Sequence, residues 1–151
     1  MSTVQLCTLL LNEEEWIEKC YLQHRDFPGL KSWVFVHGAD AAYAESNPDM
    51  VTKDGLSVDK TASILDEISR SDPRVTVVHH GWMKHTDPAQ GKMIGRNCYL
   101  EVADQVKPDY LYVCDPDEFL THQHQGQVVR MMELAPKGMN AFMFGLRSIW
   151  R

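Results

Sequence analysis

Short apolar runs alternate along the chain with longer stretches in which apolar residues recur every three or four positions. The apolar runs are rich in β-branched and aromatic residues and predict five strands, over residues 3–11, 31–37, 75–79, 110–114 and 140–146. The periodic stretches predict four helices, over about residues 13–26, 57–70, 93–106 and 125–134. This order predicts an α/β fold with a mostly parallel sheet and helices on both of its faces.

Two of the helix starts carry capping signals, and two connections are unusually long. Asn12 is predicted to cap the first helix, with Glu13–Glu15 in its first turn, and Ser57 is predicted to cap the second. Residues 38–55 and 80–91 show neither the helical spacing nor the strand pattern of apolar residues. They are therefore predicted to be irregular loops that are either functional or mobile.

Polar residues follow the predicted strands at four places, which are Asn12, His37–Asp40, His79–Gly81 and Asp115–Glu118. The carboxyl ends of parallel strands meet at one edge of a sheet, and ligands of open α/β sheets bind beyond that edge. The pattern therefore predicts one ligand site built from these four segments.

The segment Asp115-Pro116-Asp117-Glu118 places three carboxylates within four positions, directly after the strand that starts at Tyr110. Carboxylates this close repel one another and raise each other's pKa unless a cation lies between them. All-oxygen ligation suits Mg²⁺ or Mn²⁺, and Pro116 stiffens the turn. We therefore predict a metal site; the alternative is a solvated turn in which Asp117 or Glu118 caps a neighbouring group.

Length, charge, apolar runs and cysteine spacing limit the classes of protein to which the chain can belong. With 151 residues the chain is predicted to form a single domain, over residues 1–151, and its net charge of −6 argues against nucleic-acid binding. No apolar run reaches membrane-spanning length and the first residues do not resemble a signal peptide, so a cytoplasmic location is expected. The four cysteines lack CxxC spacing and are predicted to be reduced core thiols.

Several common motifs are missing. The sequence has no GxGxxG after the first strand, no P-loop and no GxSxG elbow, which argues against a dinucleotide fold, a P-loop enzyme and a serine acyl transferase. The histidines at 79, 80, 85, 122 and 124 could suggest a transition metal, but no predicted helix presents two of them at i, i+4, which favours solvated loop histidines.

Between about Leu6 and Phe119, four short segments are together similar to the motifs of a known family. They are Leu11-Asn12-Glu13-Glu14, Asp40 with Ser57-Val58-Asp59-Lys60-Thr61, Gly91-Lys92-Met93-Ile94-Gly95-Arg96-Asn97, and Asp115-Pro116-Asp117. In this order the chain resembles the GT-A glycosyltransferases, especially family 2 and its relatives with an Asp-x-Asp-Glu-Phe sequence.

The resemblance implies a Rossmann-like GT-A fold and a metal-dependent, inverting glycosyltransferase with a nucleotide-sugar donor, by family habit a UDP-sugar, and a carbohydrate or other hydroxyl acceptor. It implies that Asp117 binds Mn²⁺ or Mg²⁺ and that Asp115 holds the ribose or shares the metal. The implied donor-binding residues are Asn12, Glu13 and Asp40 around the base and ribose, Lys92 and Arg96 at the phosphates or sugar, and Asp115. Three of the residues in these segments also have a structural alternative to ligand binding. Lys92 would lie at a solvated helix start, Arg96 would donate to loop carbonyls, and Asp59 would cap its helix.

The chain also departs from the family. Residues 41–56 split the second signature, and His37 stands where the family often has an acid. No residue can be named as the catalytic base, since Glu133, on a predicted helix, is the only acid after Glu118. We therefore expect the donor-binding N-terminal portion of a longer enzyme, or a chain completed by a partner domain or a homo-oligomer. Two alternatives are a non-catalytic nucleotide-binding module and a sugar-nucleotide pyrophosphorylase, whose Gly-rich basic loop is absent.

Overall fold

The fold is built on a single four-stranded parallel sheet. The computed structural model describes residues 2–79, 87–136, 138–139 and 141. The strands are β1 (Val4–Leu10), β2 (Leu30–His37), β3 (Val75–His79) and β4 (Tyr110–Val113), in the order β3-β2-β1-β4. All three strand pairs are parallel, which confirms the predicted α/β class.

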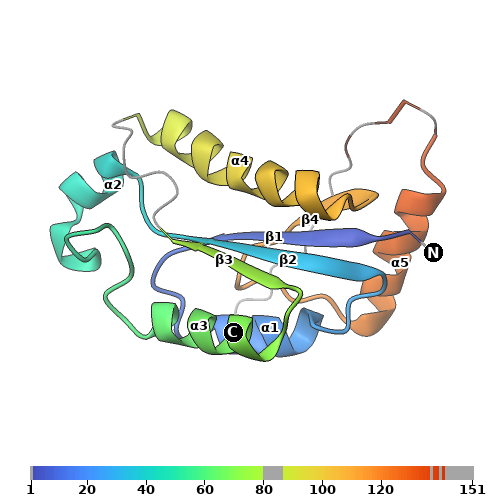
Figure 1. Cartoon of the computed structure of the whole chain (residues 1–151), viewed down its shortest axis with the longest axis horizontal. Coiled ribbons are helices and arrows are strands. Elements are labelled where there is room, and N and C mark those ends of the chain that lie inside the picture. The colour runs from blue at the N-terminus through green and yellow to red at the C-terminus, as the bar shows by residue number, and fades with distance from the viewer. Residues whose placement is uncertain (1, 80–86, 137, 140, 142–151) are drawn as a thin grey trace, which may run out of the picture.

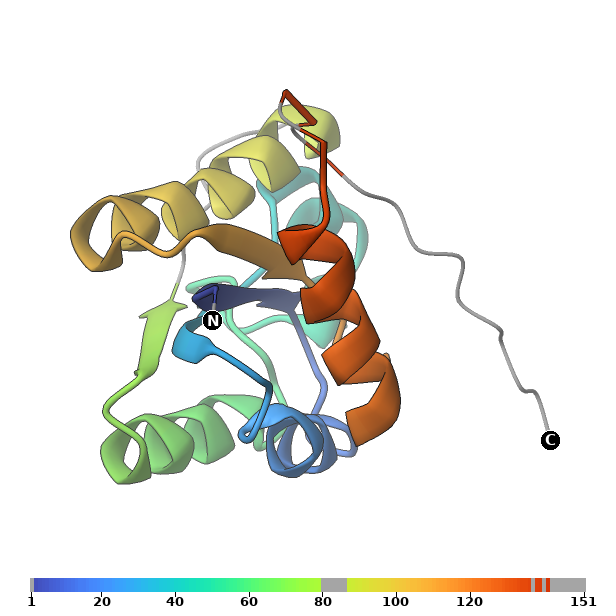
Figure 2. The ribbon, with the colours of Figure 1, turned by 90° about the vertical axis from the view of Figure 1, so that its right-hand side faces the viewer.

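Helices cover both faces of the sheet, as predicted. Helices α1 (Ile17–His24), α3 (Thr61–Ser71) and α5 (His122–Glu133) lie on one side and α4 (Pro88–Val106) lies on the other (Figures 1 and 2). The connection between β2 and α3 contains the short helix α2 (Ala41–Ser46) and a 3₁₀ turn, η1 (Pro48–Met50). Within the described ranges, no helix is both long and apolar enough to cross a membrane.

The larger hydrophobic core lies between the sheet and α1, α3 and α5. Trp33 and Phe35 are two positions apart on β2 and therefore point to the same face, where their rings stack with centroids 4.7 Å apart. The Trp33 indole Nε1–H donates to Thr8 Oγ1 at 3.0 Å, so this buried polar atom is paired.

The smaller core lies under α4. It joins Cys7, Val34 and Val36 of the sheet to Tyr99 of the helix, and all four residues are buried. The Gln5 amide donates to the Tyr99 carbonyl oxygen at 2.8 Å and ties helix to sheet. Strands β1 and β2 thus carry apolar side chains on both faces, as expected for a parallel sheet covered on both sides.

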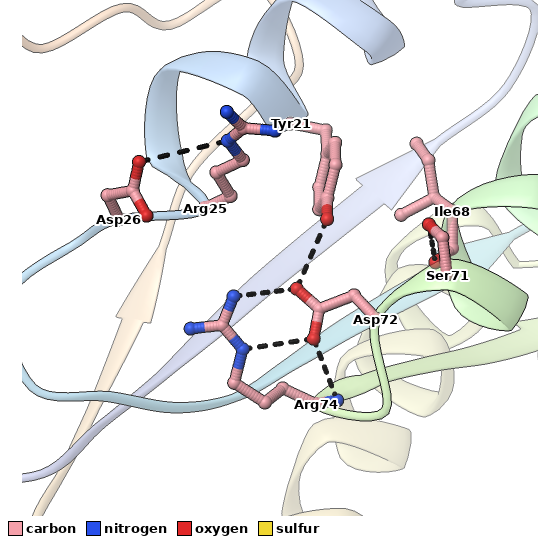
Figure 3. A network of polar contacts seen from close by, with 7 residues as sticks. All are labelled: Tyr21, Arg25, Asp26, Ile68, Ser71, Asp72 and Arg74. Carbon is pink, nitrogen blue, oxygen red and sulfur yellow. Dashed lines mark hydrogen bonds and ion pairs between the residues drawn. The ribbon is translucent and has the colours of Figure 1, made fainter.

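A polar network fastens α1 to the end of α3 (Figure 3). The Asp72 carboxylate, which follows α3, accepts hydrogen bonds from Arg74 Nε at 2.9 Å and from Arg74 NH2 at 2.7 Å. The Tyr21 hydroxyl of α1 donates to the same carboxylate at 3.2 Å. The hydrogen bonds from Arg74 lower the pKa of Asp72 below its usual range, and burial offsets part of this effect.

The predicted core thiols are confirmed. All four cysteines are free; Cys7, Cys20 and Cys114 are buried and Cys98 is partly buried. Burial raises the pKa of the Cys7 and Cys20 thiols to about 12, so both remain protonated at neutral pH.

The predicted starts of all four helices were wrong. Helix α5 begins at His122 instead of Gln125, because Thr121 caps it. Helix α1 begins at Ile17, because Asn12 takes a left-handed conformation with φ 55° that ends the strand instead of capping a helix. Helix α3 begins at Thr61, so Ser57 lies before it. Helix α4 begins at Pro88, because Asp87 caps it and accepts the Ala89 N–H at 2.9 Å.

The two predicted irregular loops have different outcomes. Residues 38–55 contain α2 and η1, so this segment is more ordered than expected. Of residues 80–91, the first seven lie outside the described residues and those from Pro88 onward are helical. The predicted strand over 140–146 lies, apart from Ala141, outside the described residues as well.

Candidate functional site

Three of the four segments predicted to form a site follow β1, β2 and β4, and the fourth, His79–Gly81, lies beyond His79 outside the described residues. Because these strands are parallel and paired in register, the segments that start at Leu11, Gly38 and Cys114 lie at the same edge of the sheet. The Gly38 N–H donates to the Leu10 carbonyl at 3.2 Å and the Cys114 N–H donates to the Cys7 carbonyl at 3.0 Å. Each segment is therefore fastened to β1 where it leaves the sheet.

A cleft of about 280 Å³ opens between the ends of β1 and β2. Its lining residues are Leu9, Leu10, Leu11, Gly38, Ala39, Asp40, Tyr43 and Lys92. Two of the predicted donor-binding residues, Asp40 and Lys92, thus line one cleft, although 52 positions separate them in the chain. Their charges lie beside a wall of leucine and alanine side chains.

Asp40 is fixed in the wall of this cleft. Its carboxyl Oδ1 accepts the Tyr43 N–H at 2.8 Å and caps α2, and the residue is buried. The cap brings Tyr43 to the cleft, a lining residue that sequence reasoning missed. An Asp followed by Ala-Ala-Tyr-Ala-Glu is a helix-start signal that could have identified it.

Lys92 and Arg96 lie one turn apart on α4. Lys92 lines the cleft, and both side chains are exposed. Burial raises the pKa of the Tyr99 hydroxyl, while Arg96 lowers it and Asp115, after the end of β4, raises it. Of the two predicted basic residues, Lys92 therefore lies at the cleft, and Arg96 interacts electrostatically with the buried Tyr99.

Asn12 is engaged by the protein on both ends of its side-chain amide. Its Nδ2 donates to the Met50 carbonyl at 2.7 Å and its Oδ1 accepts the Val58 N–H at 3.0 Å. Its backbone N–H donates to Ser57 Oγ at 2.8 Å. In this arrangement Asn12 connects the end of β1 to the loop before α3, and its neighbour Leu11 lines the cleft.

Glu13 faces the acidic turn that follows β4. Its backbone N–H donates to Thr61 Oγ1 at 2.7 Å, and the side chain is partly buried. Burial raises the pKa of Glu13, and the negative charges of Asp117, Asp59 and Asp115 raise it further. Asp59 accepts the N–H of Thr61, the first residue of α3, at 2.9 Å, although Lys60 occupies the N-cap position itself.

The turn of residues 115–118 is closed by its own hydrogen bonds. The Glu118 carboxylate accepts the Asp115 N–H at 3.1 Å, and the Glu118 N–H donates back to the Asp115 carbonyl at 3.1 Å. Pro116 is buried, whereas the side chains of Asp115 and Asp117 are exposed. Burial and then the charges of Asp115 and Asp117 raise the pKa of Glu118, partly offset by its bond to the Asp115 N–H.

These carboxylates repel one another, as the sequence predicted, and a cation would relieve the repulsion. Among the residues that the structure describes, no three histidine, cysteine or acidic side chains are grouped so as to hold a metal ion. The metal site at Asp115 and Asp117 therefore stays a prediction.

The predicted residues fall into two sets. Asp40 and Lys92 line the cleft, whereas Asp115 and Asp117 act electrostatically on Glu13. Asn12 lies between Leu11, which lines the cleft, and Glu13 in the chain. In comparisons with known proteins, no family model matches the chain and no curated protein shows a significant match.

Proposed function

We propose that the chain is a metal-dependent glycosyltransferase of the GT-A type, which moves a sugar from a nucleotide-sugar donor, a UDP-sugar, to an acceptor hydroxyl. The observation that carries the proposal is the cleft that joins Asp40 to Lys92, at the sheet edge that also holds Asp115 and Asp117. An apolar cleft with a few convergent polar groups at this edge is the usual form of a nucleotide site in an α/β sheet.

The cleft suits the nucleoside part of such a donor. Its volume of about 280 Å³ is at the lower end for small-molecule pockets and is too small for a complete nucleotide-sugar. Leu9 and Leu11 offer apolar surface to a flat base, and Asp40 offers a carboxylate to ribose hydroxyls or base N–H groups. Lys92 at the rim supplies a positive charge for the diphosphate, which would extend from the cleft towards the acidic turn.

The acidic turn suits a hard divalent cation. Asp115 and Asp117 carry exposed carboxylates that would supply oxygen ligands, and their negative charges add to the effect of burial in raising the pKa values of Glu13 and Glu118. When bound there, Mn²⁺ or Mg²⁺ would neutralise the diphosphate and stabilise the charge on the departing nucleoside diphosphate.

The sequence and the described residues identify no catalytic base. An inverting displacement needs a group that takes the proton from the attacking hydroxyl. Glu133, the only acid after Glu118, accepts the Ser2 N–H at 3.1 Å, next to the start of β1 and away from the carboxyl ends of the strands. We therefore propose that a partner domain or a second copy supplies the base.

The same position of Glu133 favours a second candidate, a nucleotide-binding module without catalysis. Release of nucleoside diphosphate from a panel of nucleotide-sugars, with and without Mn²⁺, separates the two. The transferase predicts slow metal-dependent hydrolysis of one class of donor, lost in Asp117→Ala and kept in Asp26→Ala, whose exposed carboxylate follows α1. Nucleotide binding without any turnover would favour the module, and neither binding nor turnover would contradict both.

A further inference from the structure

Two histidines form a contact at the ends of β2 and β3. His37 is fully buried, and its Nδ1 lies 2.9 Å from Nδ1 of His79, with the two rings edge to face at 81°. His79 is partly exposed, and its Nε2 lies 3.4 Å from Asp66 Oδ1 of α3. The pair thus links two strand ends to the helix between them.

The other nitrogen of His37 contacts the loop before α3. The Ser57 backbone N–H donates to His37 Nε2 at 3.2 Å, and Ser57 Oγ lies 2.7 Å from the same atom. Ser57 Oγ also accepts the Asn12 N–H at 2.8 Å. A continuous line of polar contacts therefore runs from Asp66 through His79, His37 and Ser57 to Asn12.

When both imidazoles are neutral, one arrangement of protons satisfies every contact along this line. Because a backbone N–H can only donate, His37 Nε2 must accept from Ser57, and the proton of neutral His37 lies on Nδ1. That proton points at His79 Nδ1, which must accept, so the proton of neutral His79 lies on Nε2, facing Asp66. A further proton on either imidazole makes two donors face each other. They are either the two Nδ1–H groups, or His37 Nε2–H and the Ser57 backbone N–H.

The line of contacts reaches both walls of the cleft. His37 directly precedes Gly38, Ala39 and Asp40, and Asn12 directly follows Leu11, all four of which line the cleft. The Ala39 N–H donates to the Gly55 carbonyl at 2.9 Å, in the loop that Ser57 ends. Releasing Ser57 from His37 would therefore loosen the loop against which both walls are held.

We propose that His37 and His79 are positioning residues for the cleft: while both are neutral they hold Ser57 and Asn12, and through them the two cleft walls, and one added proton releases the loop. The nucleotide ligand in this inference rests on the proposed function, whereas the positioning of the walls does not.

The electrostatics agree with a neutral His37 in the closed form. Burial, followed by His79, lowers the pKa of His37 to about 4, while Asp59 and Asp66 act in the opposite direction. In the described part of the chain these are the charged or titratable groups that act on His37 from β3, from α3 and from the loop before α3. A released loop would return His37 towards its ordinary pKa near 6.5, so acid favours release.

The first experiment uses the chain without ligand. Imidazole ¹⁵N spectra near about pH 7.5 should show neutral His37 with its proton on Nδ1. Amide exchange at Asn12, Ser57 and Ala39 should be slow there, and its protection relative to the intrinsic exchange rate at each pH should fall together at all three amides on acidification. His37→Gln should accelerate exchange at neutral pH, while His124→Gln, on the exposed side of α5, should not. An Nε2–H tautomer of His37, or exchange unaffected by His37→Gln, would overturn the proposal.

The second experiment measures affinity for UDP-glucose, which carries no group that titrates in the acidic window. Because the loop loses one hydrogen-bonded anchor, His37→Gln should weaken binding about fivefold at neutral pH. Binding should fall more steeply with acid in the parent chain than in His37→Gln, in which the carboxylates still titrate. His79→Gln, whose amide oxygen can accept from His37, should bind better than His79→Leu.

The outcomes separate the two proposals. Equal pH slopes in the parent chain and His37→Gln, or equal binding by His79→Gln and His79→Leu, would overturn the positioning role even if UDP-glucose binds. If UDP-glucose binds under no condition, the donor assignment fails and the amide exchange alone decides the positioning role.

Discussion

At the residue scale, Lys92 is the side chain whose role depends most directly on the cleft. It is exposed, so its helix does not need it for packing, yet it lies at the rim beside Asp40. A cation at this position has a function only if an anionic ligand enters.

Lys92→Met keeps the length of the side chain and removes its charge. We expect nucleoside diphosphate affinity to fall about three- to tenfold, the range of one exposed charged contact of about 1 kcal/mol. Calorimetric titration measures this, with Lys31→Met as control, because Lys31 is exposed at the start of β2. Unchanged affinity in Lys92→Met, or an equal loss in the control, would contradict the placement of the phosphates.

At the element scale, the short helix α2 forms one side of the cleft and depends on its cap. Asp40→Ala removes the acceptor of the Tyr43 N–H, and a lost N-cap costs about 1 kcal/mol. We expect faster exchange at the Tyr43 amide and weaker nucleotide binding. The matched control is Asp109→Ala, which removes a carboxylate that accepts the Thr3 N–H at 2.7 Å, near the start of β4. Binding lost equally in both variants would mean that the effect is general destabilisation.

The contact between α1 and α3 offers a test of the fold without reference to function. Asp72→Asn removes the charge that pairs with Arg74 and receives the Tyr21 hydroxyl. Because hydrogen bonds to a charged group contribute about 1.5–3 kcal/mol, we expect the free energy of unfolding to fall by that order. Urea unfolding measures the loss, and nucleotide affinity should remain unchanged. A loss below a few tenths of a kcal/mol would show that the network in Figure 3 contributes little.

Elements with strong periodicity were predictable, and those set by tertiary contacts were not. β3 matches its predicted bounds because a run of valines bounded by turn residues has few alternatives. Asn12 and Ser57 each carry an ordinary capping signal, but both are held by residues distant in the sequence, Asn12 by Met50 and Ser57 by His37. A capping residue and a loop anchor use the same side chains, so sequence alone could not separate them.

The candidate site shows the same division. Placing Asp40 and Asp115 at one sheet edge required only strand order, which the alternation of elements predicts. The contact between His37 and His79 required the register of β2 against β3, which pairs these two residues directly. The sequence showed both histidines at strand ends but carried no signal for their register.

At the scale of the whole molecule, His37 should make stability depend on pH. Its pKa in the fold is about 4, below the ordinary 6.5, so the unfolded chain binds more protons between these values. The free energy of unfolding should therefore fall as the pH drops through this window, by at most about 1.4 kcal/mol per pH unit. Asp72, whose pKa is lowered, contributes stability that is lost only at lower pH, below its ordinary 3.8.

Urea unfolding between about pH 7 and pH 4.5 tests this dependence. His37→Gln should flatten the slope, whereas Asp72→Asn should lower stability across the range and leave the slope unchanged. Equal slopes in the parent chain and in His37→Gln would show that His37 takes up no proton on unfolding.

The central claim is that this sheet edge binds a nucleoside diphosphate with the help of a divalent cation at Asp115 and Asp117. Calorimetric titration of UDP and other nucleoside diphosphates, with and without Mn²⁺, tests it most directly. We expect binding that requires Mn²⁺, prefers one base, and is lost in Asp117→Ala but retained in Asp26→Ala. Absence of binding with Mn²⁺ present, or binding that Asp117→Ala leaves unchanged, would contradict the account.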